Sequence, residues 1–192
     1  MNPSTRQLAH YGWRPAEPPL RPVLLVNPRS GGGKAARAGV AERARAKGIE
    51  VVIFTSGQDL AALAHGTVAA GADALGVAGG DGSLAIVAAA AAANSIPFVC
   101  VPAGTRNHFA LDVGVDRHDV IGALDAFTDG VERHIDFAEV NGRTFLNDVS
   151  LGMVTSPALS VARRGRSVVI WPPLPSQPGV QAGRAGPQAG RR

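Results

Sequence analysis

The sequence predicts an α/β fold built on a doubly wound, mainly parallel sheet. Short runs at 23–27, 50–54, 74–78 and 97–101 are typical of strands, and the first of them suits a strand that is buried on both faces. Segments that favour helices separate these runs, so strands and helices alternate along the chain. Such alternation indicates parallel β–α–β units, with helices on both faces of one sheet.

The segments between these strands have the composition of helices. Residues 35–47 are rich in alanine and arginine, and we expect one helix there, closed by Gly48. We expect a second helix over 59–70, ending at Gly71, and a third over 83–93. The third is apolar, but it is too short to span a membrane, which takes about 20 residues.

The pattern changes in the second half of the chain. We expect a helix over 119–129 and antiparallel strands beyond it. Residues 131–140 alternate loosely, Asn141-Gly142 is a strong hairpin signal, and 144–151 could form the returning strand. A β-rich region is therefore predicted to begin after the parallel sheet.

Composition and charge exclude several classes of protein. One cysteine in 192 residues allows neither an internal disulfide framework nor a cluster of thiolate metal ligands. The net charge of +4 suggests a nucleic-acid partner, but all 15 acidic residues precede position 149, and six arginines without an acid follow position 162. The basicity belongs to the end of the chain, so we expect no nucleic-acid partner. Because the start of the chain has no apolar signal segment, we expect a cytoplasmic protein.

The loop after the first strand is rich in glycine and reads Asn27-Pro-Arg-Ser-Gly-Gly-Gly-Lys34. Three glycines at a helix start let main-chain N–H groups approach an anion, with Ser30 as a hydroxyl donor and Lys34 as a cation. The loop is not a Walker A loop, because Pro28 and Ala35 stand where that motif requires glycine and Ser or Thr. It predicts phosphate binding, with a flexible turn and helix cap as the alternative.

The loop after the third strand places one carboxylate among glycines, in Gly79-Gly-Asp-Gly-Ser83. An aspartate at the carboxyl end of a strand suits a Mg²⁺ ion, held directly or through water, while neighbouring N–H groups meet phosphate or ribose oxygens. In the alternative interpretation Asp81 caps the next helix, and the two roles are compatible.

The loop after the fourth strand, 102–110, carries a third set of polar residues. Thr105 and Asn107 offer donors and acceptors of the kind that position phosphate or ribose, and Arg106 could neutralise phosphate. The alternative is local, with Thr105 as a helix N-cap and Phe109 in the core. Because the carboxyl ends of parallel strands lie at one edge of a sheet, the three loops together predict one ligand site.

The three loops resemble the signature of the diacylglycerol kinase catalytic domain, a family of lipid kinases that includes sphingosine and ceramide kinases. Residues 145–152 also resemble the segment that enters the second domain of that family. The resemblance spans roughly 22–152 and implies an α/β nucleotide-binding domain and a β-rich second domain, with the active site between them. The matching motifs, in the order and spacing of the family, are Asn27-Pro-x-Ser-Gly-x-Gly-Lys34, Gly79-Gly-Asp-Gly-Ser83 and Pro102-x-Gly-Thr-x-Asn-x-Phe-Ala110.

The resemblance implies an ATP-dependent lipid kinase that transfers the γ-phosphate to a lipid hydroxyl, as in diacylglycerol. ATP and Mg²⁺ are the implied cofactors, and the lipid would be met transiently at a membrane surface. Asp81 is the implied catalytic residue and Mg²⁺ ligand, whereas the general base would come from the second domain. His108 stands where many members have Asp. The implied nucleotide-binding residues are Asn27, Ser30, Gly31, Gly33, Lys34, Gly79, Gly80, Gly82, Ser83, Gly104, Thr105 and Asn107.

These expectations divide the chain into four parts. They are an irregular, proline-rich lead-in (1–21), the α/β nucleotide-binding domain (22–130), the start of a β-rich second domain (131–152) and an Arg/Pro/Gly-rich tail that we expect to be disordered (153–192). Within the tail only 168–171 could pack. Our hypothesis is that the tail is not family sequence but follows a truncation or a shifted reading frame, which would leave the cleft incomplete and the activity low.

Two alternatives to a lipid kinase remain open. An NAD kinase shares the Gly-Gly-Asp-Gly loop on a related scaffold, although the first and third loops favour the lipid kinases. A non-catalytic nucleotide-binding remnant would bind ATP without transferring phosphate. The sequence does not decide which lipid is the acceptor, or whether the protein forms a homodimer.

Overall fold

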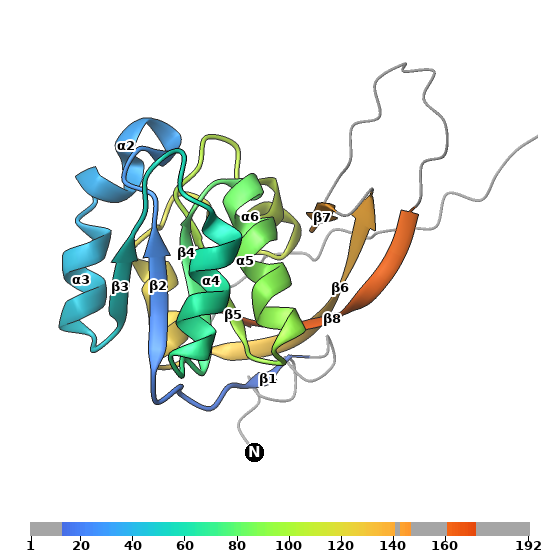
Figure 1. Cartoon of the computed structure of the whole chain (residues 1–192). Coiled ribbons are helices and arrows are strands. Elements are labelled where there is room, and N and C mark those ends of the chain that lie inside the picture. Colours follow the sequence, from blue (N-terminus) through green and yellow to red (C-terminus); the bar gives the residue numbers. More distant parts are fainter. Residues whose placement is uncertain (1–12, 141–142, 147–160, 172–192) are drawn as a thin grey trace, which may run out of the picture.

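The computed structural model describes residues 13–140, 143–146 and 161–171, and its centre is a parallel sheet (Figure 1). Four strands pair in parallel in the order β3–β2–β4–β5. Each of the four strands predicted from apolar runs is confirmed, with its ends displaced by no more than one residue. Their bounds are Pro22–Val26 for β2, Glu50–Ile53 for β3, Ala74–Gly79 for β4 and Phe98–Pro102 for β5.

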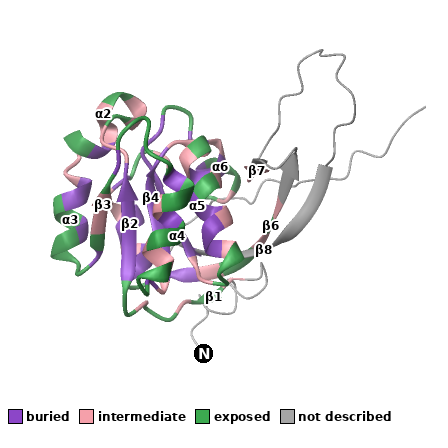
Figure 2. Ribbon diagram, in the orientation of Figure 1, coloured by how far each residue is buried: buried purple, intermediate pink, exposed green. Residues whose placement is uncertain are grey.

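Helices cover both faces of this sheet, which confirms the doubly wound arrangement. Helices α4 (Leu60–Ala69) and α5 (Asp81–Ala93) pack on one face, and α3 (Val40–Ala46) packs on the other. Neighbouring residues of β2 point to opposite faces: Leu25 contacts the cluster under α4 and α5, and Leu24 the cluster under α3. Both are fully buried, and Figure 2 shows β2 buried along its length, which explains why this strand is a continuous apolar run.

The first helix differs from the single helix predicted over 35–47. The structure divides this segment between α2 (Ser30–Arg37) and α3, because Gly39 lies between them with a left-handed φ of 62°. A left-handed residue ends a right-handed helix, and glycine adopts that conformation without steric cost. Gly39 was therefore the signal in the sequence for this break.

The other two helices follow their predictions closely. The carboxylate of Asp59 caps α4 by accepting a hydrogen bond from the N–H of Ala62 at 3.0 Å. Helix α5 begins at Asp81, two residues before its predicted start, so the second glycine loop runs into its first turn. No helix in the described part of the chain is long and apolar enough to cross a membrane.

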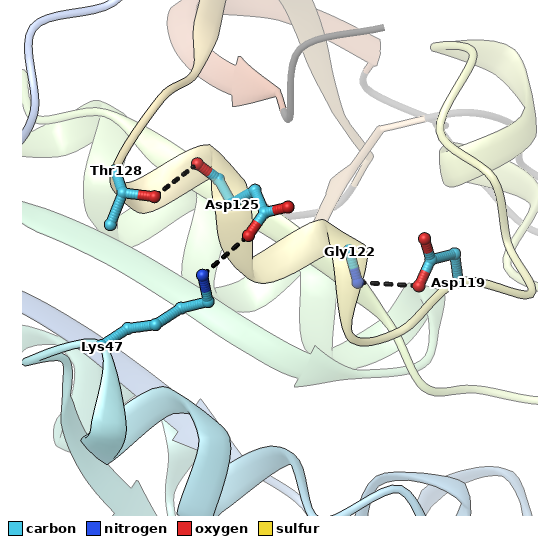
Figure 3. Close-up of polar contacts among 5 residues, drawn as sticks. All are labelled: Lys47, Asp119, Gly122, Asp125 and Thr128. Carbon is cyan, nitrogen blue, oxygen red and sulfur yellow. Dashed lines mark hydrogen bonds and ion pairs between the residues drawn. The ribbon is translucent and has the colours of Figure 1, made fainter. Parts of the chain in front are cut away.

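The helix predicted just before the antiparallel region is a shorter 3-10 helix, η1 (Gly122–Phe127). The carboxylate of Asp119 accepts a hydrogen bond from the N–H of Gly122 at 2.7 Å, and Asp125 forms an ion pair with Lys47 at 2.8 Å (Figure 3). The buried residues of η1 belong to the same cluster as those of α3. Because the ion pair is substantially exposed, it contributes only about 0–1 kcal/mol, and apolar contact holds η1 in place.

Four further strands extend the sheet at its β5 side. Strand β8 pairs in parallel with β5 through Val169 and Ile170, and it pairs antiparallel with β6. Both β1 and β7 pair antiparallel with β6. Beyond the pairing with β5, the β6–β8 ribbon curves away from the parallel strands (Figure 1). The bounds are Arg14–Pro15 for β1, Val131–Val140 for β6, Arg143–Phe145 for β7 and Val161–Trp171 for β8.

This arrangement changes three expectations. The sequence predicts a separate β-rich domain from 131–152, but β6 belongs to the same sheet as the parallel strands, joined through β8. It predicts disorder for the tail 153–192 apart from 168–171, which could pack, whereas the strand extends over 161–171, and Ile170 of the shorter stretch is buried. The irregular lead-in 1–21 contributes β1. In each case a partner strand distant along the chain supplies the hydrogen bonds that local composition does not reveal.

The hairpin predicted at Asn141-Gly142 agrees with the pairing of β6 and β7, in which Val140 lies opposite Arg143. The two turn residues lie outside the described residues. So do most of the segment that resembles the family's entry to its second domain and the stretch 172–192, so the predictions for them stay predictions.

Candidate functional site

The three loops predicted to form one site meet at the carboxyl ends of β2, β4 and β5. A methyl group on Gly104 would lie 2.3 Å from the Cα atom of Gly80, and one on Gly31 would lie 2.4 Å from the carbonyl oxygen of Ala103. A side chain at either position would displace main chain, so these glycines allow the loops to touch. The first and second loops therefore both contact the third directly.

The first loop turns through three successive left-handed glycines. Gly31, Gly32 and Gly33 have φ values of 56°, 67° and 89°, a conformation that residues with side chains rarely adopt in succession. The loop begins with a turn closed by Asn27, whose side-chain oxygen accepts a hydrogen bond from the N–H of Arg29 at 3.0 Å. Asn27, a predicted nucleotide contact, thus shapes the turn.

Lys34, which closes the first loop, directs its ammonium into the protein. Its Nζ donates hydrogen bonds to the carbonyl oxygens of Pro102 at 3.0 Å and Arg117 at 2.6 Å. Burial lowers the pKa of Lys34 below its ordinary value, and the neighbouring carboxylate of Asp116 offsets that shift only in part. The cation predicted to face phosphate therefore has two main-chain partners.

Asp81 in the second loop caps a helix, but not the one on which it lies. Its two carboxylate oxygens accept hydrogen bonds from the N–H groups of His108 at 3.2 Å and Phe109 at 3.1 Å, at the start of α6 (His108–Asp112). The sequence allows a capping role on the following helix, α5, whose N-cap is instead Gly80. The carboxylate connects the second loop to the third.

Asn107 forms the turn of the third loop with its own side chain. It is only 2% exposed, and its φ is 54°. Its amide nitrogen donates to the carbonyl oxygens of Pro102 at 3.1 Å and Gly104 at 3.0 Å, and its oxygen accepts from the N–H of Gly104 at 2.8 Å. Both amide hydrogens are used, so Asn107 has no donor left for a phosphate oxygen.

Other polar groups at the loops remain available to a ligand. Within the described residues, the hydroxyl groups of Ser30, Ser83 and Thr105 make no hydrogen bond. Thr105 and Arg106 are exposed, and Ser30 and Ser83 are half-buried. Thr105 does not cap α6, which begins after Asn107. With the main-chain N–H groups of the glycines, these side chains provide a surface of donors, which suits an anion.

A metal ion would find one carboxylate at this site. In the part of the chain that the structure describes, no three His, Cys, Asp or Glu side chains are grouped closely enough to hold a metal. Mg²⁺ usually keeps several waters and combines one or two carboxylates with phosphate oxygens. Asp81 retains acceptor capacity beyond its two N–H bonds, because an ionised carboxylate has about four lone-pair sites. The donor set therefore fits Mg²⁺ carried by a nucleotide.

Cys100 and Phe109 lie in the core, which for Phe109 is the alternative that the sequence allowed. Cys100 is 1% exposed in β5, and burial, reinforced by the charge of Asp81, raises the pKa of its thiol. Phe109 is also 1% exposed, and its ring lies 6.5 Å from that of Phe98. Neither residue is positioned to take part in chemistry at the loops.

Nothing in the sequence indicates which acceptors Lys34 uses. A main-chain carbonyl such as that of Arg117 has no signature in residue type. The two N–H groups that donate hydrogen bonds to Asp81 have no signature in residue type either. The residues that carry chemistry were recognisable, but the groups that they bind were not.

A separate groove of about 600 Å³ lies between β3 and α4. Its lining includes Val52, Leu63 and Arg21, and no residue of the three loops lines it. Strand β3 is the outermost parallel strand, and α4 carries small residues on this side, which leaves the groove open.

Comparison with known proteins is consistent with this geometry. Residues 21–140 match the sequence profile of the diacylglycerol kinase catalytic domain. The chain is 35% identical over 122 residues to a diacylglycerol kinase of Mycobacterium tuberculosis (strain CDC 1551 / Oshkosh), a match that covers 62% of this chain and 40% of the relative. It is 34% identical over 94 residues to a diacylglycerol kinase of Bacillus subtilis (strain 168), covering 48% and 31% of the two chains.

A solved structure shares the fold. The crystal structure of a diacylglycerol kinase from Bacillus anthracis str. Sterne superimposes with a TM-score of 0.54 at 23% identity, covering 69% of this chain and 47% of that chain. The chain thus spans less than half the length of each of these relatives.

Proposed function

The chain belongs to the diacylglycerol kinase catalytic domain family, and on that premise we propose that its three loops form the ATP site of a lipid kinase. One observation supports this above the others: three glycine loops touch at one edge of the sheet, and within the described residues the hydroxyl groups of Ser30, Ser83 and Thr105 make no hydrogen bond. A triphosphate carries negative charge along a chain of oxygens, and such donors stabilise it.

Each loop would contribute its own donors to the nucleotide. The first would supply the N–H groups around Gly31 and the hydroxyl of Ser30, and the second the N–H group of Gly82 and the hydroxyl of Ser83. From the third, Thr105 would contribute its hydroxyl, and Arg106 would neutralise phosphate. Asp81 would hold Mg²⁺, directly or through water, and the ion would reduce the repulsion between the phosphates and an incoming oxygen.

The proposed reaction is transfer of the γ-phosphoryl group to the hydroxyl of a diacylglycerol-like lipid. The bond between the γ-phosphorus and the bridging oxygen breaks, ADP leaves, and the lipid oxygen bonds to phosphorus as its proton passes to a base outside the loops described here. Because phosphoryl transfer depends mainly on positioning and electrostatics, rigid loops are the main requirement on this part of the site. We place the protein in the cytoplasm, in transient contact with lipid at a membrane surface.

A second candidate is nucleotide binding without transfer. It is favoured by the loops themselves, in which Asp81 is the single carboxylate. An NAD kinase-like activity is the third, because its Gly-Gly-Asp-Gly loop would be the same. The three candidates share an ATP site. They differ in whether phosphate is transferred to a lipid, to NAD or not at all.

The test combines binding and transfer. Mg-ATP binding is measured by calorimetry, and radiolabelled ATP is offered with diacylglycerol in detergent micelles and, separately, with NAD. We expect Mg-ATP to bind, label to reach the lipid, and a Ser83→Ala/Thr105→Ala variant to bind about tenfold or more weakly, because it loses two donors to charged oxygens.

Thr128→Ala is the matched control, since it removes a hydroxyl that bonds to Asp125 on η1, and its affinity should be unchanged. Absence of Mg-ATP binding would refute the ATP site. Label on NAD alone would favour the NAD kinase, and binding without label on either acceptor would favour the remnant.

A further inference from the structure

The third loop and the helix after it form a segment that side chains of the other two loops hold in place. We define the held segment as residues 103–116, which contains Thr105, Arg106, Asn107 and α6. The carbonyl groups of Pro102 and Arg117 flank it on either side. Both accept hydrogen bonds from the ammonium of Lys34, so one side chain ties together the two ends of the segment.

The second tie lies inside the held segment. Asp81 accepts hydrogen bonds from the first two N–H groups of α6, at His108 and Phe109. These N–H groups belong to the first turn of a helix, where no main-chain acceptor is available within the helix. A helix of five residues is not stable by itself, so its placement depends on such contacts and on the burial of Phe109.

The two ties originate in different motifs. Lys34 extends from the first loop and Asp81 from the second, and each crosses to the third. Both are charge-assisted hydrogen bonds to main chain, which are stronger than neutral ones. Removal of the Lys34 side chain would take one donor from the carbonyl groups of Pro102 and Arg117, and removal of the Asp81 side chain would take an acceptor from two N–H groups of α6.

We propose that Lys34 and Asp81 are positioning residues, which hold the 103–116 segment so that the donors of all three loops face one phosphate chain. The proposal deepens the ATP site proposed above and presupposes it. Lys34 then acts through its two carbonyl partners, without touching phosphate. Asp81 sets the start of α6 in addition to any contact with Mg²⁺. The Thr105 hydroxyl and the N–H groups after it take their positions from these ties.

The experiment compares four variants of the full chain with the unaltered protein. Lys34→Met removes the ammonium and keeps the length of the side chain. Asp81→Asn keeps one oxygen acceptor, and Asp81→Ala keeps none. Lys47→Met is the matched control, because it removes an ammonium whose ion pair with Asp125 lies on η1, outside the held segment. Hydrogen exchange is followed by mass spectrometry in peptides covering 103–117, and Mg-ATP affinity is measured by calorimetry.

In the variants with a lost tie, exchange in these peptides should accelerate by about ten- to a hundredfold. Mg-ATP affinity should fall as exchange accelerates. The unaltered protein should bind most tightly, Asp81→Asn more weakly and Asp81→Ala most weakly, because the asparagine oxygen restores part of the tie. Lys34→Met should fall at least tenfold in affinity, and Lys47→Met should match the unaltered protein in both measurements.

Three outcomes would overturn the positioning role. If affinity falls while exchange stays unchanged, Lys34 or Asp81 contacts the nucleotide or its metal directly. If exchange accelerates while affinity stays unchanged, the ties are structural only. If Asp81→Asn binds as poorly as Asp81→Ala at equal exchange, the charge of Asp81 is what matters. Failure of the unaltered protein to bind Mg-ATP is a different result, because it refutes the ATP site itself and the positioning role with it.

Discussion

The parallel half of the sheet (β2–β5) and its antiparallel flank (β1, β6, β7 and β8) are specified in different ways. In the parallel half, each strand joins a neighbour through one short β–α–β connection, and β2, β4 and β5 are buried along their whole length, whereas the edge strand β3 is partly exposed. In the flank, strands that begin at positions 14, 131 and 161 come together from distant parts of the chain. The local sequence pattern is therefore sufficient to recognise the parallel half. The flank depends on which distant strand is available to pair with each of its strands.

The two regions meet where β8 pairs with β5, and Val131 of β6 also joins the cluster under α4 and α5. Strand β8 is in register with β5 only at Val169 and Ile170, and Ile170 enters the cluster under α3. The chain has two tryptophans, Trp13 beside β1 and Trp171 at the end of β8, so fluorescence reports on the flank. The long helices lie in the parallel half, so their far-UV circular dichroism reports on that half. If both signals change together in urea, the junction makes the two regions one cooperative unit.

The largest expected effect comes from Phe98→Ala, at the junction itself. Phe98 is fully buried in β5 and its ring lies 6.5 Å from that of Phe109. Loss of the ring leaves a cavity, and we expect the free energy of unfolding to fall by about 3–5 kcal/mol in urea titrations. A loss below about 1 kcal/mol would contradict the packing described here.

Ile170→Ala tests the junction from the side of the flank. Ile170 is 2% exposed, and we expect a loss of about 2–4 kcal/mol that is equal by fluorescence and circular dichroism. Ile86→Ala is the control, since Ile86 is 40% exposed on α5 and should cost about 1 kcal/mol or less. If Ile170→Ala lowers only the fluorescence transition, the flank unfolds as a separate unit.

Gly76→Ala tests how closely η1 packs on the parallel half. A methyl group there would lie 2.5 Å from the ring of Phe127 and 3.1 Å from the side chain of Leu24. Overpacking should cost about 1–3 kcal/mol in the free energy of unfolding. Gly66→Ala is the matched control in α4, where the space is open, and it should stabilise the protein by about 0.5–1 kcal/mol. Equal effects at the two glycines would exclude the close contact with Phe127.

The smallest of these effects is expected for Asp59→Ala, within the parallel half alone. It removes the cap of α4 and should cost about 1 kcal/mol, measured by chemical denaturation. Asp59→Asn preserves an acceptor oxygen and should lose at most half as much. If both variants match the unaltered protein, the cap observed at Ala62 does not stabilise α4.

The sequence predicts the parallel half almost completely, because strands buried on both faces and alanine-rich helices are visible in short windows. It fails at Gly39, where a helix was expected to continue through a left-handed residue. It also fails at β8, since that strand has a composition typical of a tail and is stabilised by partners at β5 and β6. A strand of this kind is defined by its partners, which no local pattern contains.

At the candidate site, the sequence identifies the loops correctly but not the partners of their charges. Three glycine loops were expected to meet, and they do. Lys34, Asp81 and Asn107 were each expected to face a ligand, and each also has main-chain partners, at Arg117, Phe109 and Pro102 respectively. A side chain that binds phosphate and one that binds a carbonyl look the same in a sequence, because only the fold determines which acceptor lies within reach.

The position of β8 has a consequence for biosynthesis. It is the last described strand along the chain, yet it lies inside the sheet, between β5 and β6. While the chain is being made, β5 has therefore formed its apolar core contacts long before its second partner exists, and until then it presents an unpaired edge. Exposed edges of this kind recruit other chains, and sheets closed by distant segments form slowly. The yield of folded protein should therefore depend on how soon residues 161–171 reach β5, and on whether a chaperone covers that edge in the interval.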